Sequence, residues 1–378
     1  MKRHAMIQAG TFMKIAIDAH AVGSQASGNE TYYRQLVSGF IRNQTKNQYT
    51  LFYTCEGARQ AFTTDSRFDF VRIPANPVLR ISVSLPLRLR RMKPDLFHCQ
   101  YIQPPWGKTR TVVTIHDLAY EHHPECFSPA EAFRSRHLVR WTARRADHIL
   151  TVSEFCAGDI ATKYEIPREK ITVARLSASE DFRPRDKQQC QEHLARKYKI
   201  DPPFMLYVGR LQARKNLPRL VEAYSLLRNR GQSPKLVLVG KKDWEAERLT
   251  AKIKELGIGS EVVLTGFVSY KDLPLFYNAA ELFVFPSFFE GFGLPVIESM
   301  ASGVPTVTSF GTALEEVAGN GALLTDPYSV HSIADAMEKI LADEELRLQL
   351  ITRGLRRSSE FKASELAEKV LKVYQSLQ

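Results

Sequence analysis

The sequence predicts an α/β protein with two doubly wound, parallel-sheet domains that face each other across a cleft. Three observations support this fold class. The chain of 378 residues is too long for one compact core and suits two domains of ordinary size. Short apolar runs alternate with helical patterns from one end to the other. The polar stretch at residues 178–186, ASEDFRPRD, divides this alternation and is the best candidate for a linker.

The alternation predicts strands and helices in both halves of the chain. Candidate strands of the first half lie at residues 14–17, 49–53, 70–73, 96–99, 111–115, 148–152 and 171–173. Candidate strands of the second half lie at residues 204–208, 235–239, 262–265, 282–285, 306–308 and 322–324. Candidate helices lie at residues 29–44, 131–145, 217–229, 245–256 and 332–342. Ligands of open parallel sheets bind at the carboxyl ends of the strands, so we expect functional residues in the loops that follow them.

The composition is that of a globular protein, with 44% hydrophobic and 25% charged residues. No run of about eighteen apolar residues occurs, so no transmembrane helix is expected. Residues 1–12 lack the apolar core of a signal peptide, and a strand that begins near Met13 suggests that they are a leader or an upstream start. Five cysteines without C-x-x-C spacing predict reduced thiols in a cytoplasmic protein, with neither a zinc site nor a disulfide framework.

The positive charge is concentrated in the first half. Residues 1–200 hold 31 Lys and Arg against 19 Asp and Glu, a net charge of +12, whereas residues 201–378 hold 21 against 22, a net charge of −1. This asymmetry suggests that the first half meets an anionic partner, such as a phosphorylated acceptor, a membrane surface or nucleic acid. A basic surface that only keeps the protein soluble is the alternative.

Two common phosphate-binding motifs are missing. The first predicted strand is followed by DAHAVGSQASGNET, which lacks G-x-G-x-x-G, and the chain contains no G-x-x-x-x-G-K-[ST]. Dinucleotide-dependent and P-loop chemistry are therefore disfavoured.

The richest stretch is residues 286–305, PSFFEGFGLPVIESMASGVP, between a predicted strand and a helical pattern. Gly291 and Gly293 let the backbone approach a ligand, and the first amides of the helix are unpaired donors for an anion. Glu290 and Glu298 can face one cavity, where paired carboxylates accept hydrogen bonds from vicinal hydroxyls. A second loop, GRLQARKN at residues 209–216, places Arg210 and Lys215 before a helix, which suits a diphosphate.

The string E-G-F-G-L-P-x-x-E-x-M-A-x-G-x-P resembles the E-x7-E signature of retaining, nucleotide-sugar-dependent glycosyltransferases of the GT-B fold, in particular glycosyltransferase family 4, also called glycosyl transferases group 1. The resemblance covers most of the chain and is strongest over residues 208–327. It implies two Rossmann-like domains, at residues 13–183 on the acceptor side and at residues 184–360 for the nucleotide sugar. It further implies a terminal helix at residues 361–378 that crosses back to the first domain.

The resemblance also assigns roles on the donor side. Glu298 would hold the donor ribose, and Glu290 would face the transferred sugar. Arg210 and Lys215 would contact the diphosphate, with Arg214 as a weaker third candidate. The remaining implied donor contacts are the segment Gly291, Phe292, Gly293 and Leu294 near the sugar and diphosphate, Phe267 and Val268 along the nucleobase, and Gly28 near the diphosphate.

On the acceptor side, the resemblance points to the pair His116 and Asp117, which follows a predicted strand in TIHDLAYEHHP. His116 is the first choice for a contact with the transferred sugar, and Asp117 is the second. Glu30 is a further acceptor-side candidate. It lies in GNETY, where related sequences often carry G-x-G-R-Y, so the match is weaker at this point. The turn RLSAS at residues 175–179 departs from the family pattern as well.

Residues 78–93, VLRISVSLPLRLRRMK, combine apolar and basic side chains. Such a segment can lie on an anionic lipid surface, and a solvated face is the alternative. Pro86 would interrupt any single helix here.

Taken with the residues, the resemblance implies metal-independent, front-face transfer of a hexosyl group, with retention, from a nucleotide diphosphate sugar to a saccharide or lipid-linked acceptor. No cofactor, metal or nucleic acid is expected, and no D-x-D motif occurs. The location would be the cytoplasm, where the protein could meet the inner face of a membrane. A sugar-nucleotide epimerase or phosphorylase on the same scaffold, or a polyanion-binding protein, is the alternative. The donor base and sugar, the acceptor and the oligomeric state stay open.

Overall fold

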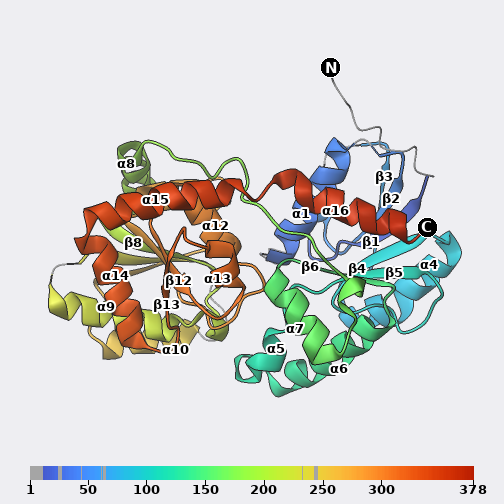
Figure 1. Cartoon of the computed structure of the whole chain (residues 1–378), viewed down its shortest axis with the longest axis horizontal. Helices are drawn as coiled ribbons and strands as arrows, with labels where there is room; N and C mark the ends of the chain where they lie inside the picture. Colours follow the sequence, from blue (N-terminus) through green and yellow to red (C-terminus); the bar gives the residue numbers. More distant parts are fainter. Residues whose placement is uncertain are drawn as a thin grey trace.

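The computed structural model describes residues 12–23, 28–43, 45–60, 62, 65–231, 233–241 and 246–378. These residues form two parallel sheets with helices packed on both sides, arranged as two units side by side (Figure 1). The predicted α/β fold with two doubly wound domains is confirmed. The suggested leader at residues 1–12 lies, apart from Phe12, outside the described residues.

The first sheet has seven strands in the order β3-β2-β1-β4-β5-β6-β7, all parallel. The strands are β1 (Lys14–Asp18), β2 (Gln48–Tyr53), β3 (Phe68–Arg72), β4 (Leu96–Gln100), β5 (Arg110–Thr114), β6 (His148–Thr151) and β7 (Ile171–Val173). Their ends differ from the predicted ones by at most two residues. The strand order reverses between β1 and β4, and such a switch point opens a crevice for a ligand.

The second sheet has six strands in the order β10-β9-β8-β11-β12-β13. They are β8 (Phe204–Val208), β9 (Lys235–Val239), β10 (Val262–Gly266), β11 (Leu282–Phe285), β12 (Thr306–Ser309) and β13 (Leu323–Thr325). β8 and β11 are buried along their whole length, as expected of strands covered on both faces. The switch point of this sheet lies between these two strands.

Helices surround both sheets. Those of the first half are α1 (Gly28–Arg42), α2 (Glu56–Gln60), α3 (Pro77–Leu79), the π-helical turn η1 (Arg80–Ser84), α4 (Leu85–Met92), α5 (Ala119–His122), η2 (Pro124–Cys126), α6 (Pro129–Arg145), α7 (Glu154–Tyr164) and η3 (Arg168–Lys170). Those of the second half are α8 (Lys187–Tyr198), η4 (Ala213–Lys215), α9 (Leu217–Arg230), α10 (Ala246–Glu255), α11 (Leu273–Ala279), α12 (Leu294–Ala301), α13 (Ala313–Ala318), α14 (Val330–Ala342), α15 (Glu344–Ser359) and α16 (Ala363–Ser376).

The segment around Pro86 is not a single regular α-helix, which agrees with the prediction. α3, η1 and α4 follow one another without a gap, and the π-helical turn separates the two α-helices. Pro86 lies in the first turn of α4, where its missing amide hydrogen is tolerated. The wider π-helical turn precedes it.

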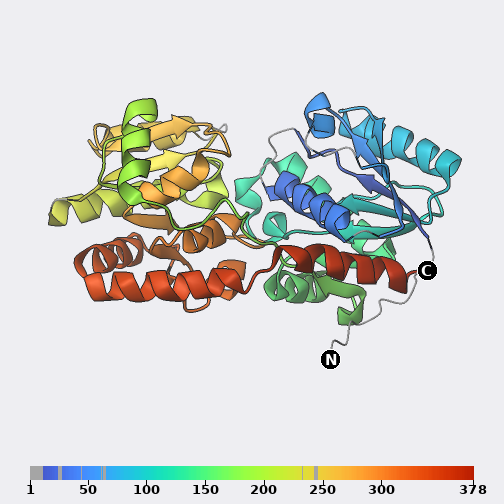
Figure 2. The same ribbon diagram turned by 90° about the horizontal axis from the view of Figure 1, so that it is seen from above.

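The last helix returns to the first half of the chain, as the two views show (Figure 1) (Figure 2). α15 lies against the second unit, and α16 packs on α1, where a Cβ atom on Gly39 would lie 2.4 Å from the Cβ atom of Ala367. Inside this contact, His98 Nδ1 and the Tyr374 hydroxyl are 2.6 Å apart, and His98 Nε2 and Thr114 Oγ1 are 2.7 Å apart. The chain therefore joins its two units twice. The predicted domain boundary after residue 183 falls between β7 and α8, and its position stays a prediction.

Candidate active site

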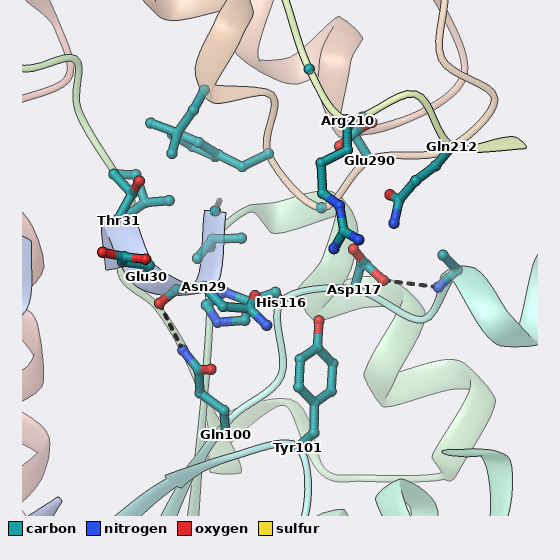
Figure 3. Close-up of a pocket in the computed structure, with 18 of the residues that line it drawn as sticks. Asn29, Glu30, Thr31, Gln100, Tyr101, His116, Asp117, Arg210, Gln212 and Glu290 are labelled. Carbon is teal, nitrogen blue, oxygen red and sulfur yellow. Dashed lines mark hydrogen bonds between the residues drawn. The ribbon is translucent and has the colours of Figure 1, made fainter. Parts of the chain in front are cut away.

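A cleft of about 2720 Å³ lies between the two units and is lined by residues of both. The loops that reach it follow β1, β4 and β5 in the first sheet and β8, β9, β10 and β11 in the second. Figure 3 shows side chains from both units pointing into this space. The switch points of the two sheets therefore face one cleft.

Two loops of the second unit meet at its switch point. The loop after β8 carries Arg214, and the loop after β11 carries Phe288 and Phe289. Phe288 N donates to the carbonyl oxygen of Arg214 at 2.9 Å, and Arg214 Nη1 donates to the carbonyl oxygen of Phe289 at 3.0 Å. These bonds hold the basic loop against the loop of the first glutamate.

Glu290 forms a buried charge cluster with two cations. Glu290 is 7% exposed, and its carboxylate accepts a hydrogen bond from Lys215 Nζ and lies 3.1 Å from Arg214 Nη1. Burial raises the pKa of Glu290, but the two cations outweigh burial and hold it below its usual range. Burial and the charge of Arg214 lower the pKa of Lys215 to about 8, although Glu290 opposes this shift. Lys215 and Arg214 are thus the cations that pair with Glu290, and the predicted contact of Arg210 and Lys215 with a diphosphate stays a prediction.

Arg210 follows β8 in the same loop as Arg214 and Lys215. Its side chain is exposed, lines the cleft, and points toward Asp117 of the first unit (Figure 3). Asp117 Oδ1 accepts a hydrogen bond from Ala119 N at 3.1 Å, which fixes the carboxylate at the start of α5. Arg210 and Asp117 therefore face each other across the cleft from different sheets.

Glu298 lies in α12 in a different environment. The side chain is 6% exposed, lines the cleft, and accepts a hydrogen bond from the Tyr277 hydroxyl at 3.0 Å. Burial raises the pKa of Glu298 to about 7, and the bond from Tyr277 offsets only part of this shift. Near pH 7 the carboxyl group of Glu298 is therefore protonated in about half of the protein molecules, unless a ligand supplies further hydrogen bonds.

The two glycines between the glutamates are required by close contacts. A Cβ atom on Gly291 would lie 2.1 Å from the carbonyl oxygen of His116, so only glycine lets the two units approach here. The carbonyl oxygen of Gly291 also accepts a bond from Ser153 Oγ at 2.8 Å. Gly293 has a φ of 99°, and a Cβ atom there would lie 2.4 Å from Leu314 Cδ2.

The start of α12 offers amide groups to the cleft. The amide nitrogens of Phe292, Gly293 and Leu294 donate no hydrogen bond to any residue that the structure describes. The Phe292 ring is buried against Phe361, so only its backbone is available to a ligand. Unpaired amides at the start of a helix suit an anion, so the predicted anion contact at this point stays a prediction.

His116 lies at the end of β5 on the opposite wall. It is 8% exposed and packs edge-on against Tyr32, with ring centroids 4.9 Å apart. Burial lowers the pKa of His116 to about 3, so the imidazole is neutral at physiological pH. Its Nε2 atom has no hydrogen-bond partner in the described part of the chain.

The other predicted residues also line the cleft. Phe267 is exposed, whereas Val268 is buried. Gly28 is the first residue of α1, and Glu30 Oε1 accepts a bond from Arg34 Nη2 at 2.6 Å. Glu30 therefore enters the cleft as half of an ion pair.

The sequence prediction missed Gln100 and Tyr101, which follow β4 and line the cleft. Their only local signal is a polar residue at the end of a strand. This signal indicates a site only once the strand order is known, because that order places β4 at the switch point of the sheet.

Within the described residues, no cluster of three or more His, Cys, Asp or Glu side chains could hold a metal ion. The same residues include no helix that is long and apolar enough to cross a bilayer.

Comparisons with known proteins agree with this architecture. The profile described as glycosyl transferases group 1 matches residues 191–357, and the profile described as glycosyltransferase family 4 matches residues 26–175. The chain is 33% identical over 294 residues to the O-antigen chain mannosyltransferase B of Escherichia coli, covering 76% of each chain.

Two solved structures are similar in fold. The sucrose-phosphate synthase of Thermosynechococcus elongatus has a TM-score of 0.79 and 20% identity, with 97% of this chain and 99% of that chain covered. HepE of Anabaena, solved with UDP and glucose, has a TM-score of 0.75 and 16% identity, with 96% of this chain and 100% of that chain covered. With both halves of the chain matched by the same kind of enzyme, the protein belongs to the glycosyl transferases group 1, of the glycosyltransferase family 4 type, and has the GT-B fold.

Proposed function

We propose that this glycosyltransferase moves a hexosyl group from a nucleoside diphosphate sugar to a saccharide or lipid-linked saccharide, with retention of the anomeric configuration. The observation that carries the proposal is the buried cluster of Glu290, Lys215 and Arg214 at the second switch point, across the cleft from His116. Mannose is the first candidate for the transferred sugar, because the Escherichia coli relative is a mannosyltransferase.

The donor diphosphate would bind where positive charge exceeds negative charge. Lys215, Arg214 and Arg210 face the cleft with Glu290 as the carboxylate among them, and the free amides at the start of α12 lie on the same side. Guanidinium groups, an ammonium group and helix amides together suit a diphosphate. Phe267 and Val268 would contact the nucleobase, and Glu298 would accept hydrogen bonds from the ribose hydroxyls.

The proposed reaction is a front-face displacement. The bond between the anomeric carbon and the phosphate oxygen breaks, and its electron pair stays on the phosphate. The acceptor oxygen forms the new bond to the anomeric carbon on the same face, and its proton passes to the leaving phosphate oxygen. The cations and the α12 amides stabilise the charge that develops on that phosphate, an effect worth roughly 3 kcal/mol per donor in other enzymes. His116, a neutral imidazole, would bind a hydroxyl of the transferred sugar.

We further infer that the segment at residues 78–93 contacts an anionic membrane surface. Val83 and Leu87 are exposed beside the exposed cations Arg88, Arg90 and Arg91. Each such cation gains up to about 1 kcal/mol near anionic lipid. Binding to phosphatidylglycerol liposomes should exceed binding to phosphatidylcholine liposomes, weaken with salt, and fall in the double variant Arg90→Gln/Arg91→Gln. Equal binding to both liposomes would contradict the inference.

A nucleotide-release assay tests the catalytic proposal. UDP-, GDP-, ADP- and TDP-sugars are offered to the wild type, to Glu290→Ala and to Glu281→Gln, with and without EDTA. Glu281 pairs with Lys187 at 2.7 Å outside the cleft and serves as a matched control. We expect release from one donor, insensitive to EDTA, that is lost in Glu290→Ala and kept in Glu281→Gln. No release and no calorimetric binding of any donor would refute the proposal, and product analysis by NMR checks retention.

A further inference from the structure

We propose that Gln100 is a sugar-binding residue whose Oε1 atom, together with Nε2 of His116, holds one hydroxyl group of a pyranose ring. This inference rests on the proposed function and adds a residue outside the E-x7-E stretch. Gln100 ends β4, at the switch point of the first sheet, where the crevice of an open sheet binds its ligand.

Both atoms are buried and lack a partner. Gln100 is 5% exposed and His116 is 8% exposed, yet neither Gln100 Oε1 nor His116 Nε2 has a hydrogen-bond partner among the residues described. Both residues line the cleft. Nearly all buried polar groups in proteins are hydrogen-bonded, so two unpaired atoms on one cleft wall indicate a ligand.

The register of the first sheet brings the two residues together. Gln100 pairs with Thr114 across β4 and β5, and His116 follows Thr114 by two residues. The rings of Tyr101 and His116 have centroids 5.7 Å apart. Figure 3 shows Gln100, Tyr101 and His116 on the same wall of the cleft.

One contact fixes the orientation of the Gln100 amide. Its Nε2 atom donates to the carbonyl oxygen of Asn29 at 3.4 Å (Figure 3). The oxygen end of the amide is therefore the unpaired end.

A strained turn holds this arrangement. Tyr101 has a φ of 58°, which is rare for an aromatic residue, and Ile102 N donates to the carbonyl oxygen of Gln100 at 2.6 Å. A three-residue turn at positive φ is uncommon and strained, and such strain persists mainly at binding and catalytic sites. The turn ends β4 at Gln100 and places the Tyr101 ring against His116.

Gln100 Oε1 and His116 Nε2 together suit a hydroxyl group as their hydrogen-bond partner. Gln100 Oε1 can only accept a hydrogen bond, and neutral His116 can donate one from Nε2. A hydroxyl group donates to the first atom and accepts from the second, so it satisfies both. A phosphate or carboxylate oxygen cannot donate and would be repelled by Oε1. The site therefore suits a neutral sugar ring, either the transferred sugar or the acceptor.

The test compares Gln100→Leu with the wild type and with the control Gln191→Leu. Gln191 Nε2 donates to the carbonyl oxygen of Ala279 at 3.2 Å outside the cleft, so its loss measures the structural cost of the same change. The probes are the sugar nucleotide selected by the release assay, forms of it that lack one sugar hydroxyl, and acceptors that lack one hydroxyl. The readout is kcat/KM for each probe.

We expect one deoxy probe to lose roughly 10- to 100-fold in kcat/KM with the wild type and with Gln191→Leu, and less than threefold with Gln100→Leu. A loss confined to deoxy donors assigns the hydroxyl to the transferred sugar, and a loss confined to deoxy acceptors assigns it to the acceptor. Equal losses in the wild type and Gln100→Leu would overturn the inference.

Binding of the free nucleoside diphosphate separates this inference from the proposed function. Gln100→Leu should bind it as the wild type does, which also shows that the variant is folded. If no donor is turned over, saturation-transfer NMR with the methyl α-glycosides of mannose, glucose and galactose tests Gln100 alone. Equal saturation of every glycoside with the wild type and Gln100→Leu would then refute the role of Gln100.

Discussion

Glu290 and Glu298 stand eight residues apart, line the same cleft, and are buried to the same extent, yet the side chains around Glu290 are cationic and the hydrogen-bond partner of Glu298 is neutral. Glu290 lies between Lys215 and Arg214, which hold its pKa below the usual range. Glu298 has the hydroxyl of Tyr277 and no ion pair with any described residue, and burial raises its pKa to about 7.

The difference indicates that the protein itself supplies the partners of Glu290, whereas a ligand would supply the missing hydrogen bonds of Glu298. Glu290 already has its partners, so it anchors two cations and forms part of the fixed electrostatic frame of the cleft. Glu298 is a desolvated carboxylate without a counter-charge, an arrangement that costs free energy unless hydrogen bonds are supplied. The hydroxyl groups of a ribose would supply them, which agrees with its proposed role.

The largest expected effect is on stability when the first carboxylate is neutralised. Glu290→Gln leaves Lys215 and Arg214 as buried like charges, and breaking a buried pair costs about 3–5 kcal/mol. Chemical denaturation at pH 7.5 should show this loss of unfolding free energy. Glu281→Gln, which removes one ion pair outside the cleft, should cost under about 1 kcal/mol. A similar small cost for both variants would mean that the cluster is solvated.

Glu298→Gln should change the free energy of unfolding in the opposite direction to Glu290→Gln. The pKa of Glu298 is about 7 in the folded protein, against an ordinary value of 4.5. A raised pKa gives a contribution to stability that is present below pH 4.5 and lost as the pH rises through 7. Glu298→Gln should therefore stabilise the free protein at pH 8, by up to about 3 kcal/mol, with the gain vanishing near pH 4.5. Denaturation curves at several pH values check this, and destabilisation at pH 8 would contradict it.

Donor binding should follow the ionisation of Glu298. Below pH 7 the carboxyl group is protonated and accepts hydrogen bonds from a ribose less well, so the donor KM should rise by up to about tenfold per pH unit. In Glu298→Gln, the KM should be high and should change little with pH. A wild-type KM that stays constant between pH 6 and pH 8 would argue against ribose binding by Glu298.

The smallest effect is expected for Tyr277→Phe. The hydroxyl of Tyr277 lowers the pKa of Glu298, so its removal should move the pH dependence of the donor KM to higher pH, by up to about one unit. Glu290 makes no contact with Tyr277, so nucleotide release at saturating donor and high pH should change little. A shift to lower pH would show that the hydrogen bond favours the neutral carboxyl group.

Local patterns were sufficient to predict the thirteen strands and the loop between Glu290 and Glu298. Runs of apolar residues mark strands that are buried on both faces, and this signal depends only on neighbouring residues. Gly291 and Gly293 were recognisable because close approach and positive φ exclude other residues. Pro86 was predicted to interrupt any single helix, and α4 begins one residue before it, directly after a π-helical turn.

The sequence by itself therefore determined the two doubly wound sheets, the family, and the loops after β5, β8 and β11 that reach the cleft. Only the tertiary structure decided that Arg214 pairs with Glu290, since Arg210 and Arg214 are both cations of the same loop and the sequence does not tell which one lies against Glu290. It also decided that Gln100 and His116 share one wall of the cleft, because β4 and β5 are neighbours in the sheet. Strands and turns are set by local interactions, whereas charge pairing and buried unpaired atoms depend on contacts between residues far apart in the chain.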